Sequence, residues 1–595
     1  MTTPARPSGP ASRAPTETSS APARPDARGR GRSAAVIVAA ALLAQAALSL
    51  QFAATASVTH DEYWHLPVGV LYWRTGRFDW EPLNPPLLRA WAAAPVAASA
   101  RQEVPAGPRP MGEYGDAFVR ENPQTFRSLY FRGRVMALML SLAASGALVA
   151  WTWRLYGPAG GALAAVVWCL NPNTIAHGAL VTTDMAAVLG FVTVLPLLMR
   201  FAEQPTWGRA LGWGAMLGAA QALKYTNLLL YPLCAVGWFL CDRPPSLERP
   251  SKGRVAGRWL VGLGVSLLVL NAAYLFQGTG RPLGDFAFRS QAVSRLQQAV
   301  STFRRLPVPL PADFLCGIDD QRAIMEQQHP VYLDGQWTVH GRPLYYVKAL
   351  VYKLPLGTLL LFGMAVVSLA RPPRDFRRSL FLLAPAALLL FVASRENMQL
   401  GVRYVLPCVA LGCVFVGRLG RLWNEPRRWL AKGLVVVAAA GSLAGLRCHP
   451  YHLAYFNEWA GGPIGGRERL VDSNLDWGQD LDGLKAWLDA ENIDEIGLAY
   501  FGTLRPEAVG IRYRLPPSRH PEPGVYAVSV NYVMGRPHAA PDGQGGARAI
   551  DLDEFFYFRL FKPVARIGDS IDVYRLTDRD VQTFENVMRA MQRRR

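Results

Sequence analysis

The chain has 595 residues, of which 51% are hydrophobic and only 18% are charged, whereas soluble domains carry about 25% charged residues. Its net charge is +19, from 63 Lys and Arg against 44 Asp and Glu. Such an excess can indicate nucleic-acid binding, but the basic residues gather beside the ends of apolar runs, as at 371–378 and 418–428. This placement favours charges that set membrane topology, so we expect no nucleic-acid partner.

The chain begins with a polar segment and a first apolar run. Residues 1–32 are rich in Pro, Ala, Arg, Ser and Thr, which predicts a disordered basic tail. The run at 34–56 could be a signal peptide, because Ala54, Thr55 and Ala56 offer small residues near a cleavage point. Its apolar stretch exceeds the 7–15 residues typical of such peptides, so we interpret it as an uncleaved membrane anchor.

Ten further apolar runs predict helices that span or enter a membrane. They lie at 134–156, 160–170, 185–201, 210–223, 228–240, 259–276, 348–369, 379–393, 405–416 and 429–446. The shorter ones reach the ~20 residues needed to cross a bilayer only with their polar flanks. We therefore expect a polytopic α-helical membrane domain at 33–447, with about eleven transmembrane helices and large loops at 59–133 and 277–346.

The last segment, 448–595, differs in pattern from the rest. Short alternating or apolar runs at 496–501, 525–530 and 571–576 predict strands, and 481–488 and 580–591 predict helices. This pattern predicts a small soluble α/β domain. A disulfide between Cys316 and Cys448 is an open alternative, since only these two cysteines lie in expected outer segments.

The orientation follows from the basic residues of the short loops. If the tail is cytoplasmic, the loops at 200–209, 243–258, 371–378 and 418–428 are cytoplasmic too, and all are crowded with Arg and Lys. The opposite short turns carry few, as the positive-inside rule requires. This scheme places both large loops and the C-terminal domain outside.

Three acidic residues stand at expected outer ends of apolar runs. Asp61 and Glu62 follow the first run, where they could simply cap a helix. Adjacent carboxylates point in different directions, so we expect them to hold different partners rather than share one proton. Asp184 could also be a helix cap, and the nearby His177 an interfacial polar residue, but acids at the mouth of a span often mark function.

Cationic residues occur on the same side as these acids. Lys224, Lys353 and Arg403 each lie at the outer end of an apolar run. They could extend toward lipid headgroups, which is the ordinary role of such residues. Together with the acids, they could instead hold a lipid-linked phosphate.

Several motifs resemble the GT-C glycosyltransferases, in particular the protein O-mannosyltransferases and the bacterial aminoarabinose transferase group. The first is the segment from Asp61 through Gly69 and Gly76 to Leu88, and the second runs from Asn171 to Asp184. The later motifs are at 352–355, 401–407, 455–458 and 472–481, so the matches run in the expected order along most of the chain.

The resemblance implies transfer of a sugar from a polyprenyl-phosphate donor to a lipid, glycan or protein acceptor, at the outer face of a bacterial inner or plasma membrane. It implies Asp61 as the base, with inversion at the anomeric carbon, and Glu62 and Asp184 as residues that position substrate or hold Mg²⁺ or Mn²⁺. The residues implied for the donor phosphate are Lys224, Arg403, Lys353 and Arg89. Those implied for substrate positioning are His65, Asn84, His177 and Tyr404.

Other interpretations remain open. The loop at 277–346 contains no inserted repeat-type domain such as eukaryotic mannosyltransferases carry, which weakens the case for a protein acceptor. We expect the motif at 472–481 to dock the soluble domain on the membrane domain, with acceptor contact as the second possibility. A transporter or flippase of a lipid-linked substrate would also use intramembrane charges. A non-catalytic membrane scaffold would require neither Asp61 nor Asp184.

Overall fold

The structure is a computed structural model that describes residues 27–241, 250–370, 375–425 and 428–593. Most of the expected disordered tail, residues 1–26, lies outside these ranges. Helix α1 (Ala27–Thr55) begins within the last part of that expected tail, so residues 27–32 are helical. Cys316 and Cys448 both remain thiols.

Long apolar helices dominate the described chain. They are α1, α5 (Phe126–Cys169), α7 (Asp184–Glu203), α8 (Trp207–Leu223), α9 (Leu230–Leu240), α10 (Lys252–Ala273), α13 (Tyr345–Lys353), α14 (Leu356–Val367), α15 (Phe376–Arg395), α16 (Leu406–Val416) and α17 (Trp429–Ser442). Among the described residues, seven helices are long and apolar enough to cross a membrane, or eight if the bent pair α13 and α14 is one span. The chain is an integral, multi-pass membrane protein.

The expected number of about eleven spans is not confirmed. Helix α8 has 17 residues and α9 only 11, which is short of the ~20 residues that a bilayer requires. The expected runs at 134–156 and 160–170 both belong to α5, which is interrupted at Gly157. There φ is 79°, a conformation that favours glycine, and Pro158 follows.

Small residues allow α8 and α10 to pack closely. A Cβ atom on Gly214 would lie 2.1 Å from the carbonyl oxygen of Gly262, and one on Gly218 would lie 2.3 Å from that of Ser266. The spacing of four residues on each helix is the small-residue pattern that brings membrane helices together.

A mixed five-stranded sheet lies in the C-terminal part of the chain. Its strand order is β4 (Arg512–Arg514), β3 (Glu495–Ala499), β5 (Gly524–Ser529), β9 (Ile571–Leu576) and β8 (Ala565–Ile567). β3 pairs in parallel with β4 and β5, whereas β9 is antiparallel to β5 and β8. The three expected strands correspond to β3, β5 and β9, and the expected helices to α19 (Leu481–Ala490) and α21 (Asp578–Arg593).

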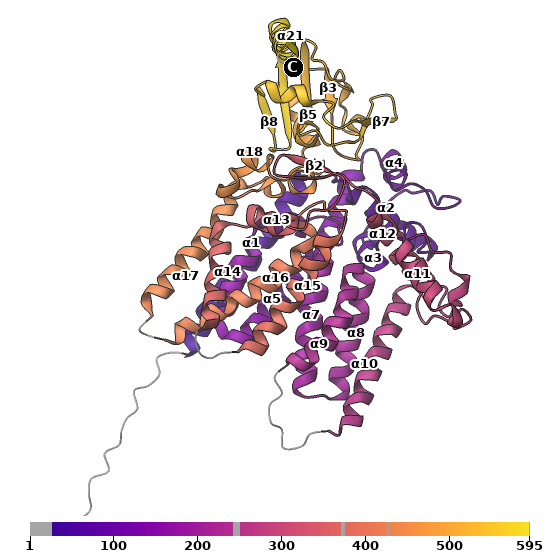
Figure 1. Cartoon of the computed structure of the whole chain (residues 1–595), viewed down its shortest axis with the longest axis vertical. Coiled ribbons are helices and arrows are strands. Elements are labelled where there is room, and N and C mark those ends of the chain that lie inside the picture. Colours follow the sequence, from indigo (N-terminus) through magenta and orange to yellow (C-terminus); the bar gives the residue numbers. More distant parts are fainter. Residues whose placement is uncertain (1–26, 242–249, 371–374, 426–427, 594–595) are drawn as a thin grey trace, which may run out of the picture.

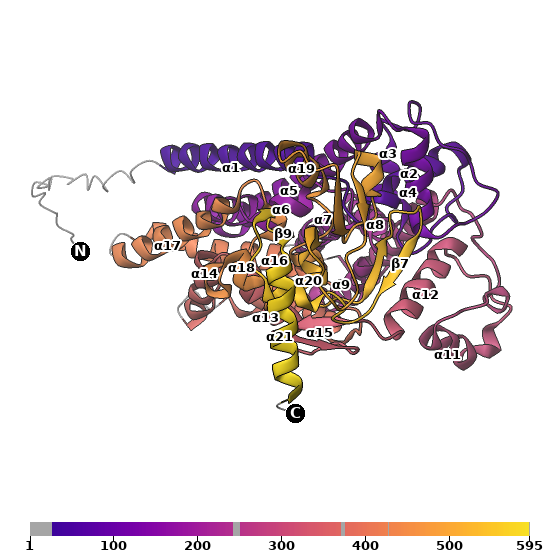
Figure 2. The ribbon, with the colours of Figure 1, turned by 90° about the horizontal axis from the view of Figure 1, so that it is seen from above.

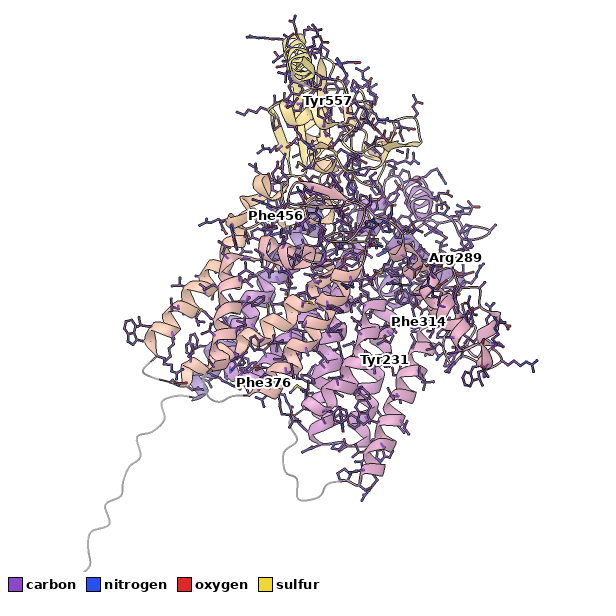
Figure 3. The ribbon with its side chains drawn as sticks, in the orientation of Figure 1. Tyr231, Arg289, Phe314, Phe376, Phe456 and Tyr557 are labelled. Atoms are coloured by element: carbon purple, nitrogen blue, oxygen red, sulfur yellow. The ribbon has the colours of Figure 1, made fainter. Side chains whose placement is uncertain are left out.

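The sheet lies above one end of the helical region (Figure 1). Seen from the sheet side, its strands lie over α7, α9 and α16 (Figure 2). Phe376, at the start of α15, marks the opposite end of the helices, and Phe456 lies at the junction (Figure 3). Short helices fill this junction (Figure 1): α2 (Glu62–Thr75), α3 (Pro86–Ala93), α4 (Met111–Glu121), α12 (Ala312–Glu326) and α13.

Candidate active site

A cavity of about 610 Å³ lies at the junction between the helices and the C-terminal part of the chain. Its lining combines charged residues at one end with an extended apolar wall. The apolar residues come chiefly from the segment after α8, from α15 and from the turn before Gly401: Leu228, Leu229, Leu389, Val392, Ala393, Met398 and Leu400. A cavity of this kind suits a ligand with a charged head and an apolar tail.

Asp61 lies at the charged end of the cavity, directly before the first residue of α2. Nη1 of Arg403 donates a hydrogen bond to its Oδ2 at 2.7 Å, and 18% of the Asp61 side chain is exposed. Arg403 follows Gly401, whose φ of 153° is unfavourable for other residues. A Cβ atom on residue 401 would lie 2.7 Å from Oγ of Ser473, which is too close. A glycine at 401 therefore lets the chain pass Ser473 in the conformation that places Arg403 at the cavity.

Asp184 joins the same cluster from below the cavity surface. It is the first residue of α7, and its side chain is only 1% exposed. Nζ of Lys224 donates to its Oδ1 at 2.6 Å, and Nη1 of Arg403 lies 3.7 Å from its Oδ2. Arg403 therefore bridges Asp61 and Asp184, while both cations, but not Asp184, line the cavity.

The electrostatics keep Asp61 ionised. Burial alone would raise the pKa of its carboxyl, but the adjacent Arg403 guanidinium holds the pKa below its ordinary value. Burial lowers the pKa of His65 to about 3, so its imidazole is neutral at physiological pH. Its Nδ1 lies 2.9 Å from the carbonyl oxygen of Val181, so Nδ1 carries the proton and Nε2 is an acceptor.

Two further residues from the expected set line the cavity beside the cluster. The Tyr404 ring lies 5.5 Å from Nζ of Lys224 and 4.9 Å from Cζ of Arg403. Oδ1 of Asn84 accepts a hydrogen bond from the Thr183 hydroxyl at 3.4 Å. The structure thus brings together Asp61, His65, Asn84, Lys224, Arg403 and Tyr404 around one cavity, with Asp184 directly behind.

Glu62 does not line this cavity. Its carboxylate accepts hydrogen bonds from Nε and Nη2 of Arg134 at 2.9 and 2.7 Å, and its side chain is fully buried. The backbone N–H groups of Thr59 and Val181 and the Thr59 hydroxyl also donate to it. These contacts use its acceptor sites, so the structure gives no support to the expected contact of Glu62 with substrate or metal, which stays a prediction.

Three other expected residues are buried away from the cavity. Arg89 pairs with Glu81 and donates to the Tyr72 hydroxyl, and Lys353 donates to the carbonyl oxygens of Leu453 and Asn474. Neither Arg89 nor Lys353 lines the cavity, so their expected direct contact with a donor phosphate gains no support and stays a prediction. The His177 ring lies beside that of Trp477, with centroids 6.1 Å apart, and does not line the cavity, so its expected contact with substrate also stays a prediction.

The segment 472–481 holds the junction together. Nδ2 of Asn474 donates to the Tyr345 hydroxyl, its Oδ1 accepts from the N–H of Val402, and Oγ of Ser473 donates to the carbonyl of Leu400. These contacts link the segment to the membrane helices, as the docking interpretation requires. The segment also contributes Asp472 and Trp477 to the cavity.

Sequence reasoning missed several residues on the C-terminal side of the cavity. Two of them, Asp472 and Trp477, belong to the motif at 472–481, but the expected main role of that motif was to dock the soluble domain. Nothing in the local pattern singled out the others, which lie after β3, after the short helix α20 (Val530–Val533) and at the start of strand β6 (His538–Pro541): Phe501, Arg536, Pro537 and His538.

The described residues do not fit a divalent metal site. Among them, no three His, Cys, Asp or Glu side chains gather closely enough to hold an ion. Asp61 and Asp184 already have cationic partners, and the acceptor sites of Glu62 are occupied. The expectation of Mg²⁺ or Mn²⁺ therefore gains no ligand set among the described residues.

One family model matches part of the chain. Residues 124–270 match the profile of the dolichyl-phosphate-mannose-protein mannosyltransferase family, and this range contains Asp184 and Lys224. No curated protein matches the sequence.

Solved structures show overall similarity at low identity. ArnT from Cupriavidus metallidurans is similar over 91% of this chain and 97% of that one. The identity is 12% and the TM-score 0.44 for its structure bound to undecaprenyl phosphate. The identity is 13% and the TM-score 0.45 for its apo structure. The Archaeoglobus fulgidus oligosaccharyltransferase in complex with Zn and sulfate is similar over 76% of this chain and 56% of that one, at 11% identity and a TM-score of 0.40. The chain resembles the GT-C membrane glycosyltransferases, as its motifs indicate and as the family match over residues 124–270 shows.

Proposed function

We propose that the protein transfers a sugar from a polyprenyl-phosphate donor to a lipid, glycan or protein acceptor, with Asp61 as the base. The observation that carries this proposal is the cluster of Asp61, Arg403, Asp184 and Lys224 at one end of a cavity with an apolar wall. The two cations suit a phosphate, the wall suits a polyprenyl chain, and Asp61 suits an acceptor proton. The family match over Asp184 and Lys224 supports the same reaction.

The reaction follows from these positions. The acceptor hydroxyl or amine attacks the anomeric carbon of the donor and loses its proton to Asp61. The bond from that carbon to the phosphate oxygen breaks, and the polyprenyl phosphate leaves with its negative charge beside Lys224 and Arg403. A single displacement of this kind inverts the anomeric configuration.

Donor binding would also strengthen the base. In the described structure Arg403 holds the pKa of Asp61 low, which keeps the carboxylate ionised but weakly basic. A donor phosphate competes with Asp61 for the same guanidinium, since Arg403 lines the cavity. Binding of the donor therefore raises the pKa of Asp61 toward its ordinary value at the moment when a proton must be taken.

Asp184 acts through the cations in this mechanism. Its side chain is buried behind Lys224 and Arg403 and contacts both. It therefore positions the two phosphate-binding groups rather than touching substrate. Glu62 supports the turn that carries Asp61, through its contacts with Thr59 and Arg134.

The cavity is proposed to open at the outer face of a bacterial inner or plasma membrane. Arg418 and Arg421 pair with Asp375, which directly precedes α15, and Arg377 and Arg378 follow on that helix. The cavity-lining residues of α15 lie toward its other end, so the basic end is opposite the cavity. The positive-inside rule then supports a cytoplasmic basic end and an extracytoplasmic cavity and C-terminal sheet.

The test uses purified protein in lipid nanodiscs with radiolabelled polyprenyl-phosphate sugars and a membrane-extract acceptor pool. We expect transfer of label by the wild type and a loss of about 10²- to 10⁴-fold in Asp61→Asn. Asp79→Asn is the matched control, because this carboxylate belongs to the same loop but is exposed and paired only with Arg77. Equal transfer by wild type and Asp61→Asn would remove Asp61 from the mechanism.

The same preparation separates the competing functions. A flippase would move labelled lipid between leaflets without breaking the sugar–phosphate bond, and a scaffold would do neither. Product analysis after transfer identifies the acceptor, and its anomeric configuration tests the single displacement.

A further inference from the structure

The cavity has a third part that the proposed mechanism does not use. It lies on the side nearest the C-terminal sheet, and we call it the roof cluster. Its members are His60, Trp64, Asp472, Phe501, Arg536 and His538, and all six line the cavity. Four of them come from the C-terminal part of the chain and two from the segment that carries Asp61.

Aromatic rings form one side of the roof cluster. The His60 and Phe501 rings stack, with centroids 5.8 Å apart and planes 8° apart. Trp64 meets His60 edge-on at 5.2 Å, and His538 lies 5.0 Å from Phe501. These rings give the cavity flat, apolar faces within a few ångströms of charged groups.

An ion pair forms the polar side. Nη2 of Arg536 lies 2.5 Å from Oδ2 of Asp472, and each of these side chains is only 9% exposed. Cζ of Arg536 also lies 5.1 Å from the centre of the Phe501 ring, so the guanidinium is fixed from two sides. Asp472 has a φ of 64°, a conformation that is unfavourable for a residue with a side chain and that concentrates at functional sites.

Three polar atoms of the cluster are buried without a partner. They are Nε1 of Trp64, Nε of Arg536 and Nδ1 of His60, none of which has a hydrogen-bond partner in the described part of the chain. Counted over the whole residue, backbone included, Trp64 and Arg536 are each 7% exposed. A buried donor that stays unsatisfied costs free energy, so these groups indicate a ligand that supplies several hydrogen-bonding atoms.

We propose that the roof cluster is the subsite for the sugar ring of the donor, and that it takes a neutral, hydroxyl-bearing pyranose. One face of a pyranose presents C–H groups that pack on aromatic rings, while its hydroxyls both donate and accept. The Asp472 carboxylate and the imidazole accept from hydroxyls, and the indole and guanidinium N–H groups donate to them. This inference rests on the proposed function.

The order of groups along the donor matches the order of surfaces in the cavity. A polyprenyl-phosphate sugar is apolar, then anionic, then hydroxylated. The apolar wall lies on α15 and the segment after α8, the cations follow, and the roof cluster lies toward the sheet. Trp477 connects the last two, because Cζ of Arg403 lies 4.3 Å from its ring. With the phosphate on Lys224 and Arg403, the sugar falls beside the roof cluster.

The charge of the subsite selects among sugars. Asp472 is neutralised by Arg536, and burial lowers the pKa of both His60 and His538, so both imidazoles are uncharged at neutral pH. The nearest other charges, Asp61 and Arg403, also pair with one another. No unpaired cation among these described residues would hold an acidic sugar, which favours a neutral one.

The test compares two kinds of lipid probe. Binding of undecaprenyl phosphate is measured beside binding of undecaprenyl phosphate carrying glucose, galactose or mannose. We expect the wild type to bind at least one sugar-linked lipid about 10-fold more tightly than the bare phosphate. Trp64→Phe keeps an aromatic ring but removes the indole N–H donor together with the pyrrole part of the ring, and should lose about 3- to 10-fold for that sugar-linked lipid and nothing for the bare one.

Trp73→Phe is the matched control, since Trp73 lies on the same helix, is 59% exposed and does not line the cavity. Phe501→Leu is a second variant that removes the aromatic face and should act in the same selective way. Equal affinity of the wild type for bare and sugar-linked lipids, or equal losses for both lipids in the variants, would overturn the subsite and leave the proposed function standing. If the wild type binds neither lipid, the proposed function falls, and the subsite with it.

Discussion

Asp61 and Glu62 are neighbours in the chain, yet they occupy opposite kinds of site. Asp61 faces a cavity, keeps 18% of its side chain exposed and has one cationic partner that a ligand could displace. Glu62 is fully buried, and Arg134, Thr59 and Val181 together saturate its carboxylate. One carboxylate can change partners during a reaction, and the other cannot.

This difference separates the acid that we propose as the base from a structural one. Both carboxylates have a pKa below the ordinary value: burial raises the pKa, but a guanidinium and other nearby groups together lower it by more in each case. The direction of the shift therefore does not distinguish them. What distinguishes them is whether the cationic partner is also accessible to substrate, as Arg403 is and Arg134 is not.

The largest effect on stability is expected at the buried ion pair of Glu62 and Arg134, which we call the closed site. Glu62→Gln removes the charge that compensates Arg134, whose side chain is only 4% exposed. An uncompensated buried cation costs about 3–5 kcal/mol, so we expect a large loss of folded protein at physiological temperature. Thermal unfolding in detergent, followed by size-exclusion chromatography, measures it.

Glu203→Gln provides the matched control for this comparison. Glu203 also pairs with an arginine, Arg154, but the two side chains are 28% and 44% exposed. A solvated pair of this kind contributes about 0–1 kcal/mol. Equal destabilisation by the two substitutions would show that Glu62 is not a special structural site.

A smaller effect, and one chiefly on activity, is expected at Lys224, because Arg403 still lies beside the buried Asp184 when the lysine is removed. Lys224→Met removes one of the two cations that face the donor phosphate but leaves Arg403 beside Asp184. We expect kcat/KM for a polyprenyl-phosphate sugar to fall about 10- to 100-fold, because one charge-assisted contact with the leaving group is lost. Lys224→Arg should restore part of this loss. A variant with full activity and reduced stability would make Lys224 a partner of Asp184 only.

Much of the site was predictable because its residues lie at the ends of apolar runs. Asp61, Asp184, Lys224 and Arg403 each occupy such a position, and helix ends on one side of a membrane come together. Lys353 shares this pattern but points into the contact with Leu453 and Asn474. The position in the sequence shows that a residue lies at a helix end but not where its side chain points. Lys353 therefore could not be told apart from Lys224 and Arg403, which line the cavity.

The roof of the cavity was not predictable in the same way. Arg536 comes after the short helix α20 and His538 begins strand β6, in a region whose sequence predicts a separate soluble domain. No periodic pattern in the sequence indicates that these residues approach the membrane domain. Their approach depends on long-range contacts such as that between Asn531 and the backbone of Asp472. The number of spans stays a prediction for a related reason, because the sequence of a short apolar run such as α9 does not show whether it crosses a bilayer.

The smallest effect is expected at two carboxyls that hold the roof in place. Burial raises the pKa of Asp476 to about 7 and that of Asp480 to about 8, and each accepts a hydrogen bond from a serine hydroxyl of the C-terminal region, Ser529 and Ser570 respectively. A carboxyl with a raised folded-state pKa contributes its full stability below its ordinary value of 3.8. That contribution is lost as pH rises through about 7 to 8, because the buried groups must then ionise.

We therefore expect the melting temperature of the wild type to fall by about 2–5 °C between pH 6 and pH 9, and part of that fall to vanish in Asp476→Asn and Asp480→Asn. The amide imitates the neutral carboxyl in shape and cannot ionise, so the variants should gain stability over the wild type chiefly at high pH. Asp489→Asn is the control, since that carboxylate is 63% exposed and pairs only with Lys485. A wild type and Asn variants that lose stability in parallel above pH 7 would show that these two carboxyls are ionised in the folded protein. The roof would then be held by charged contacts, like the closed site at Glu62, rather than by neutral ones.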